Sequence, residues 1–326
     1  MKNSILERHR ARRRELTGLA IAVLAALAPA PVLAQTWLAP KGEGSFAFGY
    51  ANIWVNEHAY DDGVPIPRGN IYTQSLASNL GYAVTDRFTV GVGIPFVASK
   101  YEGAFPHVPV GRPSIDTGSY HATFQDLRLE GRFMATTGSF VVTPFLAVTL
   151  PSHGYESWAH SAVGKDLKEI QAGASFGRRL DPVLANAYFQ ARYGFAVPER
   201  VLGVWHNRSN LDFDVGYFVT PALTVRALGF WQITHGGFRE QIDSKATPIN
   251  YAHHDQLDRS IFFDLGFGAS YSLTRSLDGY ASWFKTLSAR NGHMIAGALS
   301  VGVSVNFSPA QMLRKTPART LKVTEE

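Results

Sequence analysis

The ten residues at 298–307, ALSVGVSVNF, place an apolar side chain at every second position, with small or polar residues between. Because alternate side chains of a strand point to opposite faces, this period predicts a strand with one apolar and one polar face. Its length also suits a tilted strand that crosses a membrane, which needs about 9–11 residues.

The same alternation recurs along the chain, and we find no helical period after Gly42. We predict twelve strands, at 43–56, 71–84, 88–101, 120–135, 140–150, 166–178, 184–197, 207–219, 223–235, 259–273, 277–288 and 293–307. The connections alternate between short turns and longer polar loops, and Asn291-Gly292 is a strong hairpin signal. Short turns at one end and long loops at the other are typical of outer-membrane barrels.

The charged residues lie in the middle of strands, opposite a continuous apolar face. In 120–135, Asp126, Arg128, Glu130 and Arg132 share one parity, and Leu127, Leu129 and Phe133 share the other. This sidedness predicts an apolar face toward lipid and a charged face toward an aqueous lumen. Since unpaired backbone groups cost several kcal/mol in hydrocarbon, such a sheet must close. We therefore predict one all-β fold, a single antiparallel transmembrane β-barrel of about twelve strands.

Two arrangements are consistent with the residues predicted to face the lumen. They would line a selective constriction of opposed charges, or they would pair and fill a narrow barrel. The candidates are Asp126, Arg128, Glu130, Arg132, Glu169, Arg192, Arg208, Asp212, Asp214, Arg226 and Asp264.

A sequence pattern that occurs three times in the chain supports the barrel. The segments GYAVTDRFTV, GYFVTPALTV and SYSLTRSLDG each place a tyrosine three residues before a turn threonine. These residues, Tyr82, Tyr217 and Tyr271, share the parity of the apolar face, so we predict that they form an aromatic girdle at the periplasmic edge.

The first 34 residues have a basic start, an apolar segment interrupted by Pro29 and Pro31, and small residues before Gln35. This pattern predicts a cleaved export signal at 1–34 rather than a membrane anchor. Without it, 25 basic and 24 acidic residues remain, so nucleic-acid binding has no support. The chain has no cysteine, which excludes disulfides and thiolate sites.

We expect a short periplasmic lead-in at 35–42, the barrel at 43–307 and a periplasmic tail at 308–326. The last strand ends on Phe307 and resembles the C-terminal signal read by the outer-membrane assembly machinery, although nineteen residues follow it here. The lead-in is too short for a plug domain. We therefore expect any gate to come from an outer loop, 102–119 or 236–258.

Several stretches resemble the outer-membrane barrel family labelled "MetA-pathway of phenol degradation". They are FQDLRLEGRF, PFLAVTLPSHGYES, GKDLKEIQAGASFGRRL and NAYFQARYGF. The family's frequent Pro-Thr-Gly is replaced here by Pro151, Ser152, His153 and Gly154. The resemblance implies a transporter in the outer membrane and uptake of small aromatic or hydrophobic molecules.

Three features of the sequence resemble catalytic or metal-binding sites, and each has a simpler interpretation. The GASFG segment at 173–177 spells a nucleophile elbow but lies within a predicted strand, whereas the motif needs a strand-turn-helix. A barrel phospholipase would need a serine beside His121 or His293, and none is identifiable. His253, His254 and Asp255 could bind a metal, but solvated loop polarity is the commoner reason for such a cluster. We expect no catalytic residues, no metal and no cofactor.

The sequence thus predicts a channel for passive uptake of small solutes in the outer membrane of a Gram-negative bacterium. Its expected partners are membrane lipid, the assembly machinery and small-molecule solutes. A barrel enzyme and a structural or adhesive protein are the alternatives. The sequence does not determine the oligomeric state.

Overall fold

The computed structural model describes residues 36–109, 111–243 and 251–310. The predicted signal at 1–34 and most of the predicted tail, 311–326, lie outside the described residues. Within them, no helix is long and apolar enough to cross a membrane.

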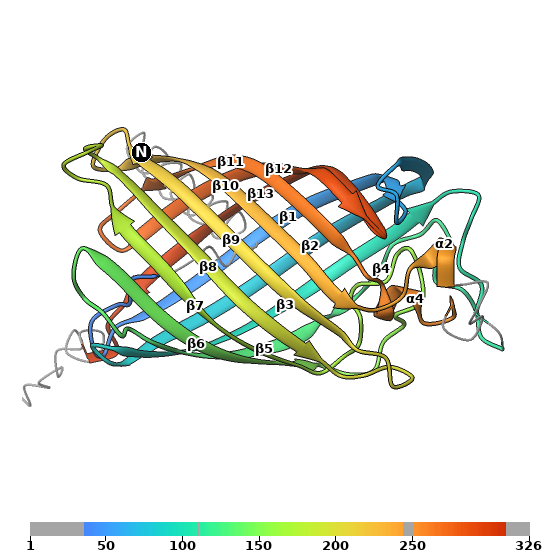
Figure 1. Cartoon of the computed structure of the whole chain (residues 1–326). Helices are drawn as coiled ribbons and strands as arrows, with labels where there is room; N and C mark the ends of the chain where they lie inside the picture. The colour runs from blue at the N-terminus through green and yellow to red at the C-terminus, as the bar shows by residue number, and fades with distance from the viewer. Residues whose placement is uncertain (1–35, 110, 244–250, 311–326) are drawn as a thin grey trace, which may run out of the picture.

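The described chain is one antiparallel sheet that closes on itself (Figure 1). Its strands are β1 (Gly44–Ala59), β2 (Pro65–Thr85), β3 (Phe88–Glu102), β4 (His121–Phe124), β5 (Asp126–Phe133), β6 (Phe140–Pro151), β7 (Glu169–Arg179), β8 (Ala187–Pro198), β9 (His206–Phe218), β10 (Leu223–Gly236), β11 (Ile261–Ser272), β12 (Leu277–Arg290) and β13 (Gly292–Phe307). The strands pair in sequence order, except that β4 and β5 both pair with β3, and β1 pairs with β13, so the sheet closes into a barrel. This satisfies the requirement that a sheet in hydrocarbon have no unpaired edge.

β4 and β5 together occupy one strand position, because both pair with β3. Gln125 separates them, and its backbone N–H donates to the Pro95 carbonyl at 2.9 Å. With that pair counted as one strand, the barrel has the twelve strands that the alternation predicts. Ala298–Phe307 forms most of β13, as expected.

Two expectations about the loops are wrong. The predicted loop at 57–70 is only a five-residue turn, since β1 extends to Ala59 and β2 begins at Pro65. Two single-turn helices, α2 (Glu240–Asp243) and α4 (His254–Leu257), lie in the last long loop, where we expected no helix. One helical turn is too short to produce a detectable 3.6-residue period.

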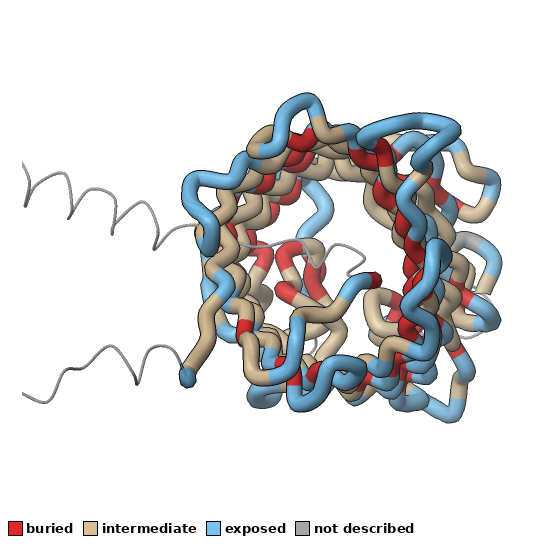
Figure 2. Tube along the Cα trace, turned by 90° about the vertical axis from the view of Figure 1, so that its left-hand side faces the viewer, coloured by how far each residue is buried: buried red, intermediate tan, exposed pale blue. Residues whose placement is uncertain are grey.

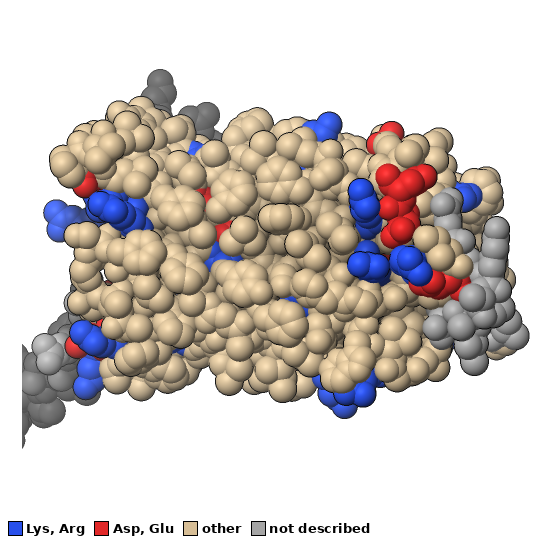
Figure 3. Space-filling view, viewed as in Figure 1, with Lys and Arg blue, Asp and Glu red and all other residues tan. Residues whose placement is uncertain are grey.

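The outer surface of the barrel is apolar. Phe267, Leu146 and Phe133 are 64%, 56% and 49% exposed, although all lie in regular strands. Figure 3 shows Lys, Arg, Asp and Glu gathered mainly toward the two ends of the barrel, with a largely uncharged middle. The apolar face thus points outward, as a lipid-facing surface requires.

The two ends differ in their connections. One end, here called the inner end, carries the short turns, for example 86–87 and 219–222. The other, the outer end, carries the long loops 103–120, 152–168 and 237–260. The largest fully buried side chains, Tyr101, Phe238 and Leu257, lie at the outer end, so the molecule's apolar packing sits beneath these loops.

Candidate functional site: the lumen and its two closures

The predicted lumen charges gather on one wall of the barrel, formed by β5 to β10. Arg192 of β8 donates two hydrogen bonds to Glu130 of β5, at 3.1 and 2.6 Å. These strands are separated by β6 and β7, so the Arg192 side chain crosses their inner faces, with its guanidinium 3.6 Å from the centre of the Phe145 ring. A two-pronged guanidinium–carboxylate pair of this kind holds both groups in one geometry.

Two further arginines flank this pair. Arg128 donates to Glu130 and to the Gln171 amide oxygen, each at 2.8 Å. Arg132 lies 3.6 Å from the other side of the Glu130 carboxylate. Three arginines therefore surround one glutamate, and the local charge of this cluster is positive. We call Arg128, Glu130, Arg132 and Arg192 the arginine cluster.

A second pair lies nearer the inner end. Asp214 binds the Arg226 guanidinium and accepts from the Gln190 amide at 2.8 Å. Tyr188 completes this group at 3.3 Å from Asp214. Only 1% of Asp214 is exposed, so its charge is neutralised within the wall rather than offered to solvent.

The remaining candidates are spread along the same wall and beyond it. Arg208 pairs with Glu169 toward the outer end, and Asp126 accepts from the Tyr155 hydroxyl at 2.5 Å. Asp212 lies opposite Arg192 in the β8–β9 register. Asp264 stands apart on β11 and accepts from Thr286 at 2.6 Å.

The facing wall, formed by β13, β1 and β2, carries small side chains. In register, Ser45, Ala47, Gly49 and Ala51 of β1 meet Asn306, Ser304, Gly302 and Ser300 of β13, and Gly81, Asn79, Ala77 and Ser75 of β2. Their neighbours of the other parity, such as Phe46, Leu80 and Leu299, are 40%, 44% and 46% exposed on the outside. The interior is thus lined by long charged groups on one side and by short side chains on the other.

A short N-terminal segment enters the inner mouth (Figure 2). Gly42 is tied to β2 through the Ala83 carbonyl at 2.8 Å. At the other end of the segment, the Thr36 carbonyl accepts from the Thr143 hydroxyl of β6 at 2.7 Å, and the Thr36 N–H donates to Gln190 of β8 at 3.3 Å. Residues 36–42 therefore span the mouth from one wall to the other. We call them the inner strap.

Trp37 divides the inner mouth into two cavities. One, of about 460 Å³, has Arg179, Tyr188 and Phe218 in its lining; the other, of about 310 Å³, has Ser45 and Arg132. Trp37 lines both and meets Tyr188 edge-on, with ring centres 6.1 Å apart. The strap was expected only as a lead-in of residues 35–42, and sequence analysis considered only the outer loops as a gate.

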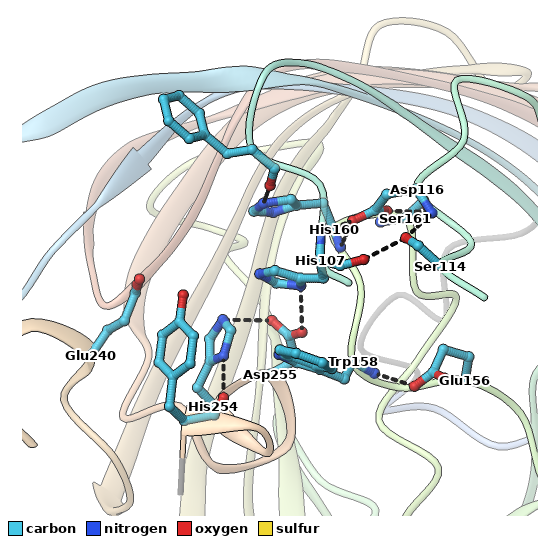
Figure 4. A network of polar contacts seen from close by, with 12 residues as sticks. His107, Ser114, Asp116, Glu156, Trp158, His160, Ser161, Glu240, His254 and Asp255 are labelled. Atoms are coloured by element: carbon cyan, nitrogen blue, oxygen red, sulfur yellow. Dashed lines mark hydrogen bonds and ion pairs between the residues drawn. The ribbon is translucent and has the colours of Figure 1, made fainter. Parts of the chain in front are cut away.

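The three long loops meet over the outer end, and Asp116 holds two of them together (Figure 4). Its carboxylate accepts from the backbone N–H groups of His107, His160 and Ser161 at 2.9, 3.1 and 2.9 Å, and from the Ser161 hydroxyl at 2.6 Å. The third loop joins through Gln256, whose amide donates to the Lys165 carbonyl at 2.9 Å. We call the described parts of these loops, residues 103–109, 111–120, 152–168, 237–243 and 251–260, the outer lid.

The outer lid is rich in titratable groups. Burial and the neighbouring His107 lower the pKa of His160 to about 4. Burial acts to lower the pKa of His107 as well, but the Asp255 carboxylate outweighs it, so that pKa is raised. Burial raises the pKa of Asp258 to about 7. Protonation of the outer end therefore changes near neutral pH.

The seam between β12 and β13 parts toward the outer end. Their pairing runs from Leu277↔Val305 to Phe284↔Ala298 and stops there. Beyond it, β12 stays paired with β11 and β13 with β1. A cavity of about 280 Å³ lies at this parting, lined by Lys285, Thr286, Leu287, Met294 and Ile295 among others. The barrel wall is thus incompletely paired at one place.

The three tyrosines of the predicted girdle lie on the outer surface near the inner end. Tyr82, Tyr217 and Tyr271 are 40%, 43% and 51% exposed. Tyr82 pairs in register with Gly44, the first residue of β1, which places it at the inner rim. The girdle role itself stays a prediction.

Ser175 of the GASFG segment lies inside β7, opposite Thr143 and Arg192 in register. The strand-turn-helix that a nucleophile elbow needs is not present there, which removes that interpretation.

Sequence reasoning missed several residues of this site. Gln171 shares the inward parity of its strand with Glu169 and could have been found from it. Thr36, Trp37 and His107 carry no local signal, because their contacts lie far away in the chain.

No family model and no curated protein matches this chain. Among solved structures it is similar to an outer membrane channel from Pseudomonas putida F1, at 12% identity and a TM-score of 0.65, covering 85% of this chain and 99% of the other. It also matches the β domain of the Bordetella autotransporter BrkA at 13% identity and a TM-score of 0.47, covering 82% and 100%. The NanC porin matches at 11% identity and a TM-score of 0.45, covering 79% of this chain and 98% of the porin. The first similarity shows that the chain has the fold of an outer-membrane β-barrel, and the apolar exterior agrees with this fold.

Proposed function

We propose that the protein is a channel for passive passage of small solutes across the outer membrane. The observation that carries this proposal is the division of the lumen into a charged wall on β5 to β10 and a small-residue wall on β13, β1 and β2. Charged side chains held in ion pairs on one wall face short side chains on the other. In such an interior, hydrated solutes pass beside fixed dipoles and ions. Similarity to an outer membrane channel agrees with this function.

The arginine cluster supplies the selectivity in this proposal. Its three guanidinium groups share one carboxylate, and the Arg128 side chain, 29% exposed, presents its charge to the lumen. Anions are then favoured at this height over cations of the same size. Asp214 and Glu169 add no net charge, because each is paired with its own arginine.

The test is planar-bilayer recording under a salt gradient with wild type, Arg192→Glu and Arg128→Glu. Each substitution reverses one charge of the cluster, so we expect the reversal potential to move toward cation preference. Arg275→Glu, on an exposed inner turn, is the matched control and should change the potential little. Absence of conductance in the wild type would contradict the proposal and favour an enzyme or a structural protein. Unchanged potentials in both variants would reduce the cluster to packing.

For the solute class, we propose small aromatic or hydrophobic molecules, as the resemblance to the phenol-degradation barrels implies. The parting of β12 and β13 supports it, since Leu287, Met294 and Ile295 line the cavity there beside the lipid-facing surface. Flux of phenolics, sugars and amino acids into protein-loaded liposomes separates the possibilities. Faster entry of sugars than of phenolics of similar size would contradict the solute class but not the channel.

A further inference from the structure

Two histidines and one aspartate converge within the outer lid, from loops far apart in the chain. His107 Nδ1 lies 3.3 Å from Asp255 Oδ2, and His254 Nε2 lies 3.3 Å from Asp255 Oδ1. One ligand atom from each of the three residues falls within 4.8 Å of the other two. Figure 4 shows the carboxylate lying between the two imidazoles.

Each imidazole is held in a fixed orientation. The His254 Nδ1–H donates to the Tyr251 carbonyl at 2.7 Å, which leaves the Nε2 lone pair facing Asp255. A carbonyl acceptor on the remote ring nitrogen is the usual support of a metal-binding histidine. The His107 ring is stacked between Trp158 and His160, with ring centres 5.4 and 4.1 Å away.

The converging atoms are buried without the hydrogen bonds that burial normally requires. His107 and His254 are 8% and 4% exposed. His107 Nδ1 and Asp255 Oδ2 have no hydrogen-bond partner, although they lie 3.3 Å apart. A buried polar atom left unpaired costs about 1–3 kcal/mol, so an occupant that binds these atoms would remove a penalty.

The distances suit a tetrahedral metal ion. Zinc binds imidazole nitrogen and carboxylate oxygen at about 2.0–2.2 Å, and a tetrahedron of that size has edges of about 3.3–3.6 Å. Each histidine nitrogen lies 3.3 Å from one Asp255 oxygen, His107 Nδ1 from Oδ2 and His254 Nε2 from Oδ1, and one ligand atom from each residue lies within 4.8 Å of the other two. A cavity of about 250 Å³, lined by both histidines together with Glu240 and Tyr251, provides access and room for a further ligand.

A second grouping, of His107 with Asp116 and His160, is a weaker candidate. Asp116 already accepts four hydrogen bonds from the two loops that it joins. Its oxygens are therefore committed to the lid. His253, the third residue of the loop motif, turns to Gln256 at 3.0 Å.

We propose that His107, His254 and Asp255 bind one divalent transition-metal ion of the zinc class. The ion joins loop 103–120 to loop 237–260 and so fastens the outer lid. Ordinary loop polarity was the expected reason for His254 and Asp255, and their third partner, His107, lies 147 positions before His254 in the chain. The inference stands apart from the proposed channel function.

The test is calorimetric titration of zinc chloride into the purified full chain in detergent, without a histidine tag and after removal of metal with a chelator. We expect one ion per chain. His254→Gln and Asp255→Asn should weaken binding at least about tenfold. His153→Gln removes a histidine that bonds to Thr123 and Ser152 and packs on Tyr155, so this variant should bind zinc like the wild type. Unchanged affinity in His254→Gln and Asp255→Asn would overturn the proposal, as would an equal loss in His153→Gln.

A second measurement needs no variant. X-ray absorption at the zinc edge of the loaded wild type should show two imidazoles among the ligands, with bonds of about 2.0–2.1 Å. A shell with one imidazole or none would overturn the assignment. The shift in gel mobility on heating reports whether each variant is folded. If a variant does not fold, the absorption spectrum of the wild type decides the assignment.

Discussion

The two ends of the lumen are closed by different means. The outer lid is fixed by charged and titratable groups, with Asp116 at its centre and His107, His160 and His254 around it. The inner strap is held by backbone hydrogen bonds at Thr36, Lys41 and Gly42 and by the edge of one indole ring, with the Asp86 carboxylate accepting from the Lys41 N–H at 2.9 Å. The outer closure therefore contains several titratable side chains, whereas the inner closure depends mainly on backbone hydrogen bonds and packing.

The largest expected effect comes from Asp116→Ala. The change removes four hydrogen bonds to a charged acceptor, each worth about 1.5–3 kcal/mol. Limited proteolysis of the outer loops should accelerate by more than about tenfold, since 1.4 kcal/mol corresponds to a factor of ten. Asp116→Asn keeps one acceptor oxygen, so its cleavage rate should lie between those of the wild type and Asp116→Ala. Equal cleavage of Asp116→Ala and wild type would mean that Asp116 does not hold the lid.

Trp37→Ala should open the inner end without affecting the outer one. Removal of the indole merges the two cavities that Trp37 separates, so single-channel conductance should rise severalfold. Trp205→Ala, which removes a half-exposed tryptophan from an outer loop, is the control and should leave conductance nearly unchanged. A conductance that does not rise would locate the resistance elsewhere, in the outer lid or the arginine cluster.

Acidification should loosen the outer lid alone. The pKa of His160 is about 4 in the closed lid, below the usual 6.5, so an opened lid binds the proton more readily. The stabilisation is present above pH 6.5 and is lost as pH falls toward 4. The raised pKa values of His107 and Asp258 contribute with the opposite sign, so the comparison with His160→Gln isolates the effect. Protease sensitivity of the lid should rise across this window in wild type and less in His160→Gln; an equal rise in both would exclude His160.

Thr143→Val should have the smallest effect. It removes one neutral hydrogen bond to the Thr36 carbonyl, worth about 0.5–1.5 kcal/mol, and keeps the side-chain volume. The strap should leave the mouth slightly more often, seen as more frequent openings with unchanged open-state conductance. An effect as large as that of Trp37→Ala would mean that this bond, rather than the indole, holds the strap.

The arginine cluster shows how far sequence reasoning reached within the site. Arg128, Glu130 and Arg132 were placed on one face from their spacing alone, because a strand repeats every two residues. That Glu130 pairs with Arg192, across two intervening strands, depends on barrel curvature and side-chain reach and has no local signature. The break at Gln125 was missed for the same reason, since its partners Pro95 and Val163 lie in other elements.

The sequence by itself determined the number of strands, the approximate bounds of each strand and which face of the sheet meets lipid. These follow from alternation within each segment, which a chain expresses without knowledge of its neighbours. Only the tertiary structure decided the inner strap, the parting of β12 and β13, and the meeting of His107 with Asp255. Such contacts depend on how loops fold back over a closed barrel, and residues that meet this way are free to stand anywhere in the sequence.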